Sequence, residues 1–205
     1  MSQSIEDKLV SRIYGSGRGW AFSQADFADL GSRSAIDLAL YRRKREGIIR
    51  RVIRGIYDYP RHSKALRGPV SPDIDQVAHA LARKFAWRIQ PDGATAQNLL
   101  GLSTQVPARI VYLSDGPDRS YTVGKTLLAF EHTALKEAGF KLPESRLLVQ
   151  ALKAYGEKRI TRKIIAQVRK KFDLALRKRV LVDTKTATGW VYSAIQEIAK
   201  EASDG

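Results

Sequence analysis

The chain has 205 residues and a formal net charge of +15, from 36 lysines and arginines against 21 aspartates and glutamates. This excess favours a polyanionic partner, because a strong positive field raises the affinity for phosphate backbones or anionic lipids. Nucleic acid is favoured over a membrane, since no apolar run approaches the ~20 residues of a spanning helix. The absence of cysteine excludes disulfides, thiolate zinc sites and a cysteine nucleophile.

The first ten residues, MSQSIEDKLV, carry acidic side chains where a secretory signal has a basic start and an apolar stretch. We therefore expect a cytoplasmic protein without a membrane partner. The three histidines are scattered along the chain, so a metal site is not expected either.

Three helices are expected in the first part of the chain. Apolar residues recur at every fourth position in SIEDKLVSRIY (4–14), which predicts an amphipathic helix. The segment WAFS predicts a short strand, and residues 23–31 predict a short helix. Residues 32–47 predict a longer helix, since Ser32 can cap its start and Gly47 can end it.

The segment IIRRVIRGIYDYP (48–60) predicts two strands about a turn at Arg54-Gly55, because its apolar residues favour strands and glycine permits a tight turn. This order of elements indicates a winged helix-turn-helix domain over residues 1–62: a helix, a short helix, a longer helix and a ribbon. The third helix of such a domain enters the major groove of DNA, and the ribbon follows the phosphate backbone. We therefore expect the ribbon arginines to face phosphate. The alternative is a solvated basic hairpin without a partner.

One face of the third helix is expected to contact DNA. Ile36, Ala39 and Leu40 share the opposite face and should pack on the first two helices. Arginine can pair with guanine through two hydrogen bonds, and serine and tyrosine can contact phosphates or base edges. Alternatively, Asp37 orients a neighbouring arginine, and the basic residues near the helix end hold acidic side chains or match the helix dipole. With the ribbon arginines, the predicted DNA-binding residues are Arg33, Ser34, Asp37, Tyr41, Arg42, Arg45, Arg50, Arg51 and Arg54.

A second domain is expected over residues 70–205, because residues 59–72 have the proline, glycine and charge content of a linker. It should begin with a helix over residues 72–86 that Ser71 caps. A β-hairpin region is expected at about 86–132, with RIVYLSDGPDRSYTVG as the hairpin and KTLLAFEHT as a third strand; helices are expected at about 143–202. The predicted fold class is α+β: an N-terminal winged helix-turn-helix, then an α+β domain with a helical C-terminal part.

No pattern of residues indicates an enzyme. GSGRG (15–19) lacks the preceding strand and the following Lys-Ser/Thr of a phosphate-binding loop, so it predicts a turn. His132 lies beside Glu131, but adjacent strand residues point to opposite faces and should not cooperate. The carboxylates do not cluster with a lysine as a metal nuclease requires. We expect no catalytic residue, no metal and no cofactor.

Two groups of polar residues leave alternatives open. The basic runs KRITRK, RKK and RKR, within residues 158–179, are either solvated helix faces or a surface for acidic protein or nucleic acid. A polar cluster beside LLGL either recognises a partner or stabilises a turn. Its members are Asn98, Ser103, Thr104 and Gln105.

Four segments together resemble the AbiEi-like antitoxins, in particular the group gathered as the bacterial DUF6088 family. They are RGWAFSQADFADLGSRSAIDLAL, REGIIRRVIRGIYDYP, PDGATAQNLLGLSTQVPARIVYLSDG and ATGWVYSAI. The resemblance extends over nearly the whole chain, and RGIYDYP is shared with many AbiEi-like proteins. Arg43 departs from the pattern, which places leucine at the end of the third helix.

The resemblance implies an antitoxin in two parts. The N-terminal winged helix would repress its own operon by binding inverted repeats in double-stranded operator DNA. The C-terminal domain would counter a toxin of the AbiEii-like nucleotidyltransferase group. The alternatives are a stand-alone winged-helix regulator with no toxin, and a metal-dependent nuclease that uses the winged helix to reach its substrate.

Overall fold

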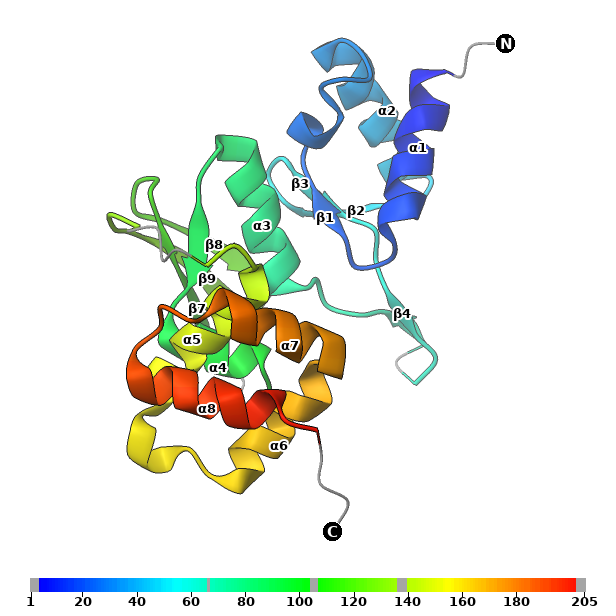
Figure 1. Ribbon diagram of the computed structural model, residues 1–205. Helices are drawn as coiled ribbons and strands as arrows, with labels where there is room; N and C mark the ends of the chain where they lie inside the picture. Colours follow the sequence, from blue (N-terminus) through cyan, green and yellow to red (C-terminus); the bar gives the residue numbers. More distant parts are fainter. Residues whose placement is uncertain (1–3, 66, 104–106, 136–139, 202–205) are drawn as a thin grey trace. The chain divides into compact units, whose positions relative to one another are not determined.

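The chain folds as an α+β protein with eight α-helices and several small sheets in its described residues (Figure 1). The computed structural model describes residues 4–65, 67–103, 107–135 and 140–201. It groups into two compact units, residues 1–89 with 116–129, and residues 90–115 with 130–205. The predicted α+β class is confirmed.

The first unit begins with two helices beside a small antiparallel sheet. Its elements are α1 (Ile5–Ser16), β1 (Ala21–Phe22), the 3-10 helix η1 (Gln24–Phe27), α2 (Arg33–Arg45), β2 (Arg50–Ile53) and β3 (Ile56–Asp58). The strand order is β1-β3-β2, and α1 and α2 lie side by side (Figure 1). These elements enclose one apolar cluster of Leu9, Ile13, Phe22, Phe27, Ile36, Ala39, Leu40 and Ile49.

Local sequence explains where these helices begin. The Ser4 hydroxyl accepts a hydrogen bond from the amide of Asp7, whose carboxylate accepts one from the Ser4 amide, which starts α1. Ser32 accepts from the amide of Ala35 and starts α2, as predicted. The short helix is smaller than expected: it is a single 3-10 turn, held by a reciprocal cap at its start and closed after Phe27.

Helix α3 (Ile74–Phe85) groups with the first unit. Its cap is Asp73, whose carboxylate accepts from two amides at the helix start, so the prediction that Ser71 caps it is wrong. Arg83 on α3 donates to the carboxylate of Asp26 at 2.5 Å and to the carbonyl of Ala21 at 2.8 Å, which fastens the helix to η1 and β1.

The stretch predicted as a linker contains a small two-stranded ribbon, β4 (His62–Ser63) with β5 (Gly68–Pro69). The division of the chain by contacts lies after Ile89, and not at residues 62–70. Because α3 packs on β1 and η1, it belongs to the same unit as the segment that precedes the β4–β5 ribbon. Independent folding of residues 1–62 and 70–205 stays a prediction.

The remaining strands form a four-stranded sheet in the order β6-β7-β9-β8. They are β6 (Ile89–Pro91), β7 (Arg109–Ser114), β8 (Arg119–Val123) and β9 (Thr126–His132). The predicted hairpin of β7 with β8 is wrong, because β9 lies between them. Only Gly124 and Lys125 connect β8 to β9, and Gly124 takes φ +61°, so the tight hairpin forms there. The expected third strand is confirmed as β9.

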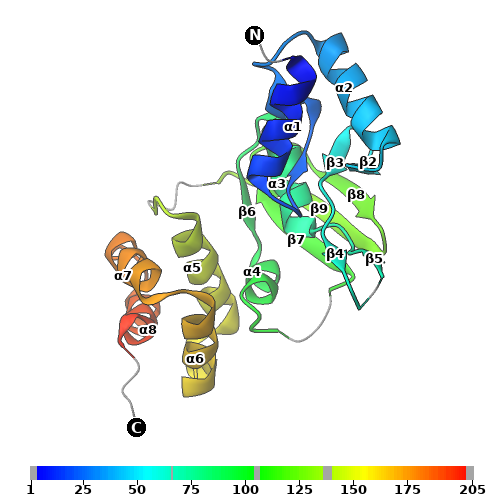
Figure 2. The ribbon, with the colours of Figure 1, turned by 90° about the vertical axis from the view of Figure 1, so that its right-hand side faces the viewer.

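The second unit is mainly helical, as predicted from residue 143 onward. It contains α4 (Gly93–Leu99), which the sequence did not indicate, and then α5 (Pro143–Tyr155), a 3-10 turn η2 (Glu157–Arg159), α6 (Arg162–Lys171), α7 (Leu174–Asp183) and α8 (Gly189–Ala199). Helices α5 to α8 pack together (Figure 2) around an apolar core that includes Leu148, Leu152, Val168, Val180, Val191 and Ile195. Of the predicted polar cluster, Thr104 and Gln105 lie outside the described residues.

Candidate nucleic-acid interface

Helix α2 has one buried and one exposed face. Ile36, Ala39 and Leu40 are each 1% exposed and belong to the core of the first unit, as predicted. The opposite face is in solvent, and two large side chains on it, Leu38 and Tyr41, are about half exposed. The predicted DNA-binding residues on α2 are all exposed: Arg33, Ser34, Asp37, Tyr41, Arg42 and Arg45.

These exposed residues differ in the ion pairs and hydrogen bonds that they form within the protein. Arg33 forms a long ion pair with Asp37, with 3.9 Å between Nε and Oδ2, so the alternative that Asp37 orients an arginine agrees with the structure. The Ser34 hydroxyl lies 3.2 Å from that of Ser32, at the start of the helix. Tyr41 and Arg45 form no ion pair or side-chain hydrogen bond with the described residues.

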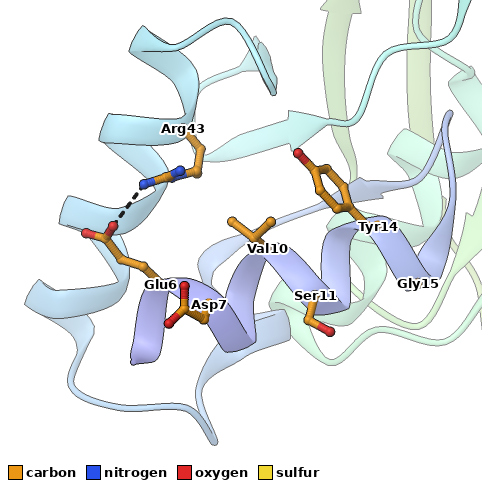
Figure 3. Close-up of a pocket in the computed structure, with 7 residues that line it drawn as sticks. All are labelled: Glu6, Asp7, Val10, Ser11, Tyr14, Gly15 and Arg43. Carbon is orange, nitrogen blue, oxygen red and sulfur yellow. Dashed lines mark hydrogen bonds and ion pairs between the residues drawn. The ribbon is translucent and has the colours of Figure 1, made fainter. Parts of the chain in front are cut away.

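Arg42 and Arg43 both reach from α2 to Glu6 on α1. Figure 3 shows the contact of Arg43 with Glu6. The distance from Nη2 of Arg43 to Oε2 of Glu6 is 2.9 Å, and Nη1 of Arg43 lies 2.8 Å from Oε2 of Glu46. Two carboxylates therefore neutralise an arginine where the family pattern places leucine. Arg42 has one ion pair within the fold and keeps about half of its side chain in solvent.

An open hollow runs along α1 beside this ion-pair cluster (Figure 3). Its lining residues are Glu6, Asp7, Val10, Ser11, Tyr14, Gly15 and Arg43. Glu6 is paired with two arginines, and Asp7 accepts from the amide and hydroxyl of Ser4. Both carboxylates are therefore engaged in holding α1 in place.

The three ribbon arginines have different environments. Arg50 binds Asp58 on β3 through two bonds, Nε to Oδ1 at 3.1 Å and Nη2 to Oδ2 at 2.5 Å, and it donates to the carbonyl of Val70 at 3.0 Å. The Asp58 side chain is only 3% exposed. Arg50 therefore neutralises a buried carboxylate, which differs from the expectation that it faces phosphate. Arg51 and Arg54 are exposed, and neither forms an ion pair with the described residues.

Two further titratable side chains, those of Glu131 and His79, have partners close by. Glu131 pairs with Arg109 at 2.7 Å, and His79 lies 3.4 Å from the carboxylate of Asp75 on the same helix. In the described part of the chain, no three histidine, aspartate or glutamate residues come together as metal ligands would. None of its helices is long and apolar enough to cross a membrane.

Some basic residues of the runs at 158–179 form hydrogen bonds within the fold, and others are exposed to solvent. Arg169 donates to the carbonyl of Glu197 at 2.6 Å, and Arg177 donates to those of Ile198 at 2.8 Å and Lys200 at 3.0 Å. These two arginines therefore hold the carbonyl end of α8, where the helix dipole favours cations. The other cations of the runs that are exposed and without an ion pair to described residues are Lys158, Arg159, Arg162, Lys163, Lys170, Lys171 and Arg179.

Residues 5–180 match the model of a family described as "Family of unknown function (DUF6088)". The chain belongs to the DUF6088 family. The match begins at the start of α1 and ends within α7, so it covers the helices and strands of the first unit and most of the second unit. A search of curated proteins found no match.

Proposed function

We propose that this DUF6088 protein is an antitoxin that binds operator DNA through a winged helix-turn-helix in its first unit. The observation that carries the DNA-binding part is the exposed face of α2. Tyr41 and Arg45 project from it without partners among the described residues, opposite the face that builds the core. The ribbon that follows α2 presents Arg51 and Arg54 to solvent.

In the proposed complex, α2 enters the major groove. Arg45 has a guanidinium free to pair with the O6 and N7 atoms of a guanine, and Tyr41 offers a hydroxyl to a phosphate or base edge. Arg51 and Arg54 bind phosphates and fix the register without reading the sequence. Arg50 acts indirectly, because its bonds to Asp58 hold β2 against β3.

The antitoxin part rests on the resemblance of the four quoted segments to AbiEi-like proteins. It assigns autorepression at inverted repeats to the first unit and defence against an AbiEii-like nucleotidyltransferase toxin to the remainder of the chain. A stand-alone regulator would have the same DNA surface but no toxin. A nuclease would need clustered carboxylates, and the described carboxylates that line the α1 hollow are already engaged.

Both parts can be tested in one set of cells. The full chain is expressed with the product of the neighbouring open reading frame and with a reporter driven by the chain's own upstream region. Repression of the reporter and rescue of growth support the proposal. The double variant Tyr41→Ala, Arg45→Ala should lose repression and keep rescue. Repression without a toxic neighbour identifies a stand-alone regulator, and loss of rescue in that variant contradicts the separation of the two roles.

A further inference from the structure

Two cations from different elements, Arg54 and Lys84, meet at the tip of the β2–β3 ribbon, and a third, Arg33, lies near enough to repel Lys84. Arg33 is the first residue of α2, Arg54 lies in the turn between the strands, and Lys84 is near the end of α3. The ammonium group of Lys84 lies directly against the turn: a Cβ atom added to Gly55 would be 2.6 Å from the Lys84 Nζ atom. Gly55 takes φ +77°, so the turn itself also requires glycine.

The charges around Lys84 have the same sign. Its pKa is lowered by partial burial and, next, by the repulsion of Arg54 and then of Arg33. Lys84 forms no ion pair with a carboxylate of the described residues, and the carboxylate of Asp37 pairs with Arg33. The Lys84 Nζ atom lies 5.3 Å from the ring centroid of Phe85, and Arg119 lies 5.1 Å from the same centroid. Such a cluster repels itself unless an anion occupies it.

A structural role for Lys84 accounts for only part of this arrangement. A lysine in the last turn of α3 matches the helix dipole, and its alkyl chain can cover apolar surface while its charge reaches solvent. Neither effect requires the ammonium group to lie at the ribbon turn beside Arg54. A position further from Arg54 would keep the dipole interaction and avoid the repulsion.

We propose that Lys84 forms, with Arg33 and Arg54, a binding site for a backbone phosphate of DNA, so that α3 belongs to the DNA-binding surface. This inference rests on the proposed function and extends it beyond residues 1–62. A phosphodiester between the three cations would neutralise their repulsion. Three cations on separate elements would also fix the ribbon tip and the start of α2 relative to one DNA strand.

The test compares variants of the full chain on a duplex from its own upstream region, by fluorescence anisotropy between about 50 and 200 mM salt. Loss of one phosphate contact lowers the log–log salt slope by about 0.9, which corresponds to roughly eightfold weaker binding at 0.1 M salt. Lys84→Gln should show this loss, and Lys84→Arg should restore most of it. The control is Lys153→Gln, which removes the same charge from an exposed site on α5 and should leave the slope unchanged.

The thermal midpoint of each variant separates folding from binding. Should Lys84→Gln be unstable, the salt slope of Arg33→Gln tests the same site. Arg33 is highly exposed at the start of α2, so its replacement should not affect folding. If the wild-type chain binds and both glutamine variants keep its slope, the phosphate site is wrong while the proposed function stands. If the wild-type chain binds no duplex, both proposals fail.

Discussion

Removing the Asp58 carboxylate is expected to loosen the ribbon, and the size of the effect follows from its surroundings. Asp58 is 3% exposed and accepts two bonds from Arg50, which is itself 30% exposed and also bonded to the carbonyl of Val70. Breaking a fully buried ion pair costs about 3–5 kcal/mol. Because solvent screens the partly exposed arginine, we expect about 2–3 kcal/mol for Asp58→Asn or Arg50→Ala.

Hydrogen–deuterium exchange locates this change in the full chain. A loss of about 2–3 kcal/mol corresponds to roughly 30- to 150-fold faster exchange of the protected β3 amides, since each 1.4 kcal/mol is tenfold. Arg51→Ala and Arg54→Ala are the matched controls, because both side chains are exposed and without ion pairs to described residues. Their exchange should stay at the wild-type level while DNA binding weakens.

One combination of results would assign Arg50 to DNA binding and not to the stability of the ribbon. If Arg50→Ala weakens DNA binding and leaves β3 exchange unchanged, then Arg50 is a phosphate contact, as the sequence suggested. In that case the Arg50–Asp58 pair contributes little to the stability of the ribbon.

Three further outcomes follow from particular contacts. Arg45→Ala should lower the ratio of upstream to scrambled duplex affinity in gel shifts, and Tyr41→Ala should do the same; an unchanged ratio for both would remove α2 from the reading of bases. The hydrogen bond from Arg12 lowers the pKa of Asp29 to about 2, so the stability from this pair is present above about pH 4 and lost as pH falls toward 2. Arg12→Ala should return the carboxyl titration, followed by NMR, to near pH 4, and an unshifted titration contradicts the assignment. Asp183→Asn should cost about 1 kcal/mol and speed exchange at the start of α5, because its carboxylate accepts from the two amides that precede that helix; slow exchange there would contradict this.

The first unit was largely predictable, because local signals specify its elements. Ser32 caps α2 as expected, and the apolar spacing of α2 places its buried face correctly. The strands β2 and β3 follow from β-favouring residues around Gly55. Short-range hydrogen bonds and side-chain periodicity decide these features, and both are visible in the sequence.

Features that depend on residues far apart in the chain were not predictable. The hairpin was placed between β7 and β8, but pairing with β9 depends on the tight turn at Gly124 and on long-range contacts. In the sequence, Arg50 cannot be distinguished from the other ribbon arginines. Its ion pair with Asp58, on the facing strand, is apparent only in the structure. Lys84 was missed for the same reason, since it joins the ribbon tip only through the packing of α3.

The proposed function depends on recognition of a particular DNA sequence by this DUF6088 protein through α2 and the ribbon. The most direct measurement is the affinity of the purified full chain for its own upstream duplex and for a scrambled duplex of equal length and composition. At one salt concentration, the upstream duplex should bind about 5- to 140-fold tighter, which corresponds to the 1–3 kcal/mol of a single good base contact. Equal affinity for the two duplexes, or no binding to either, would contradict it.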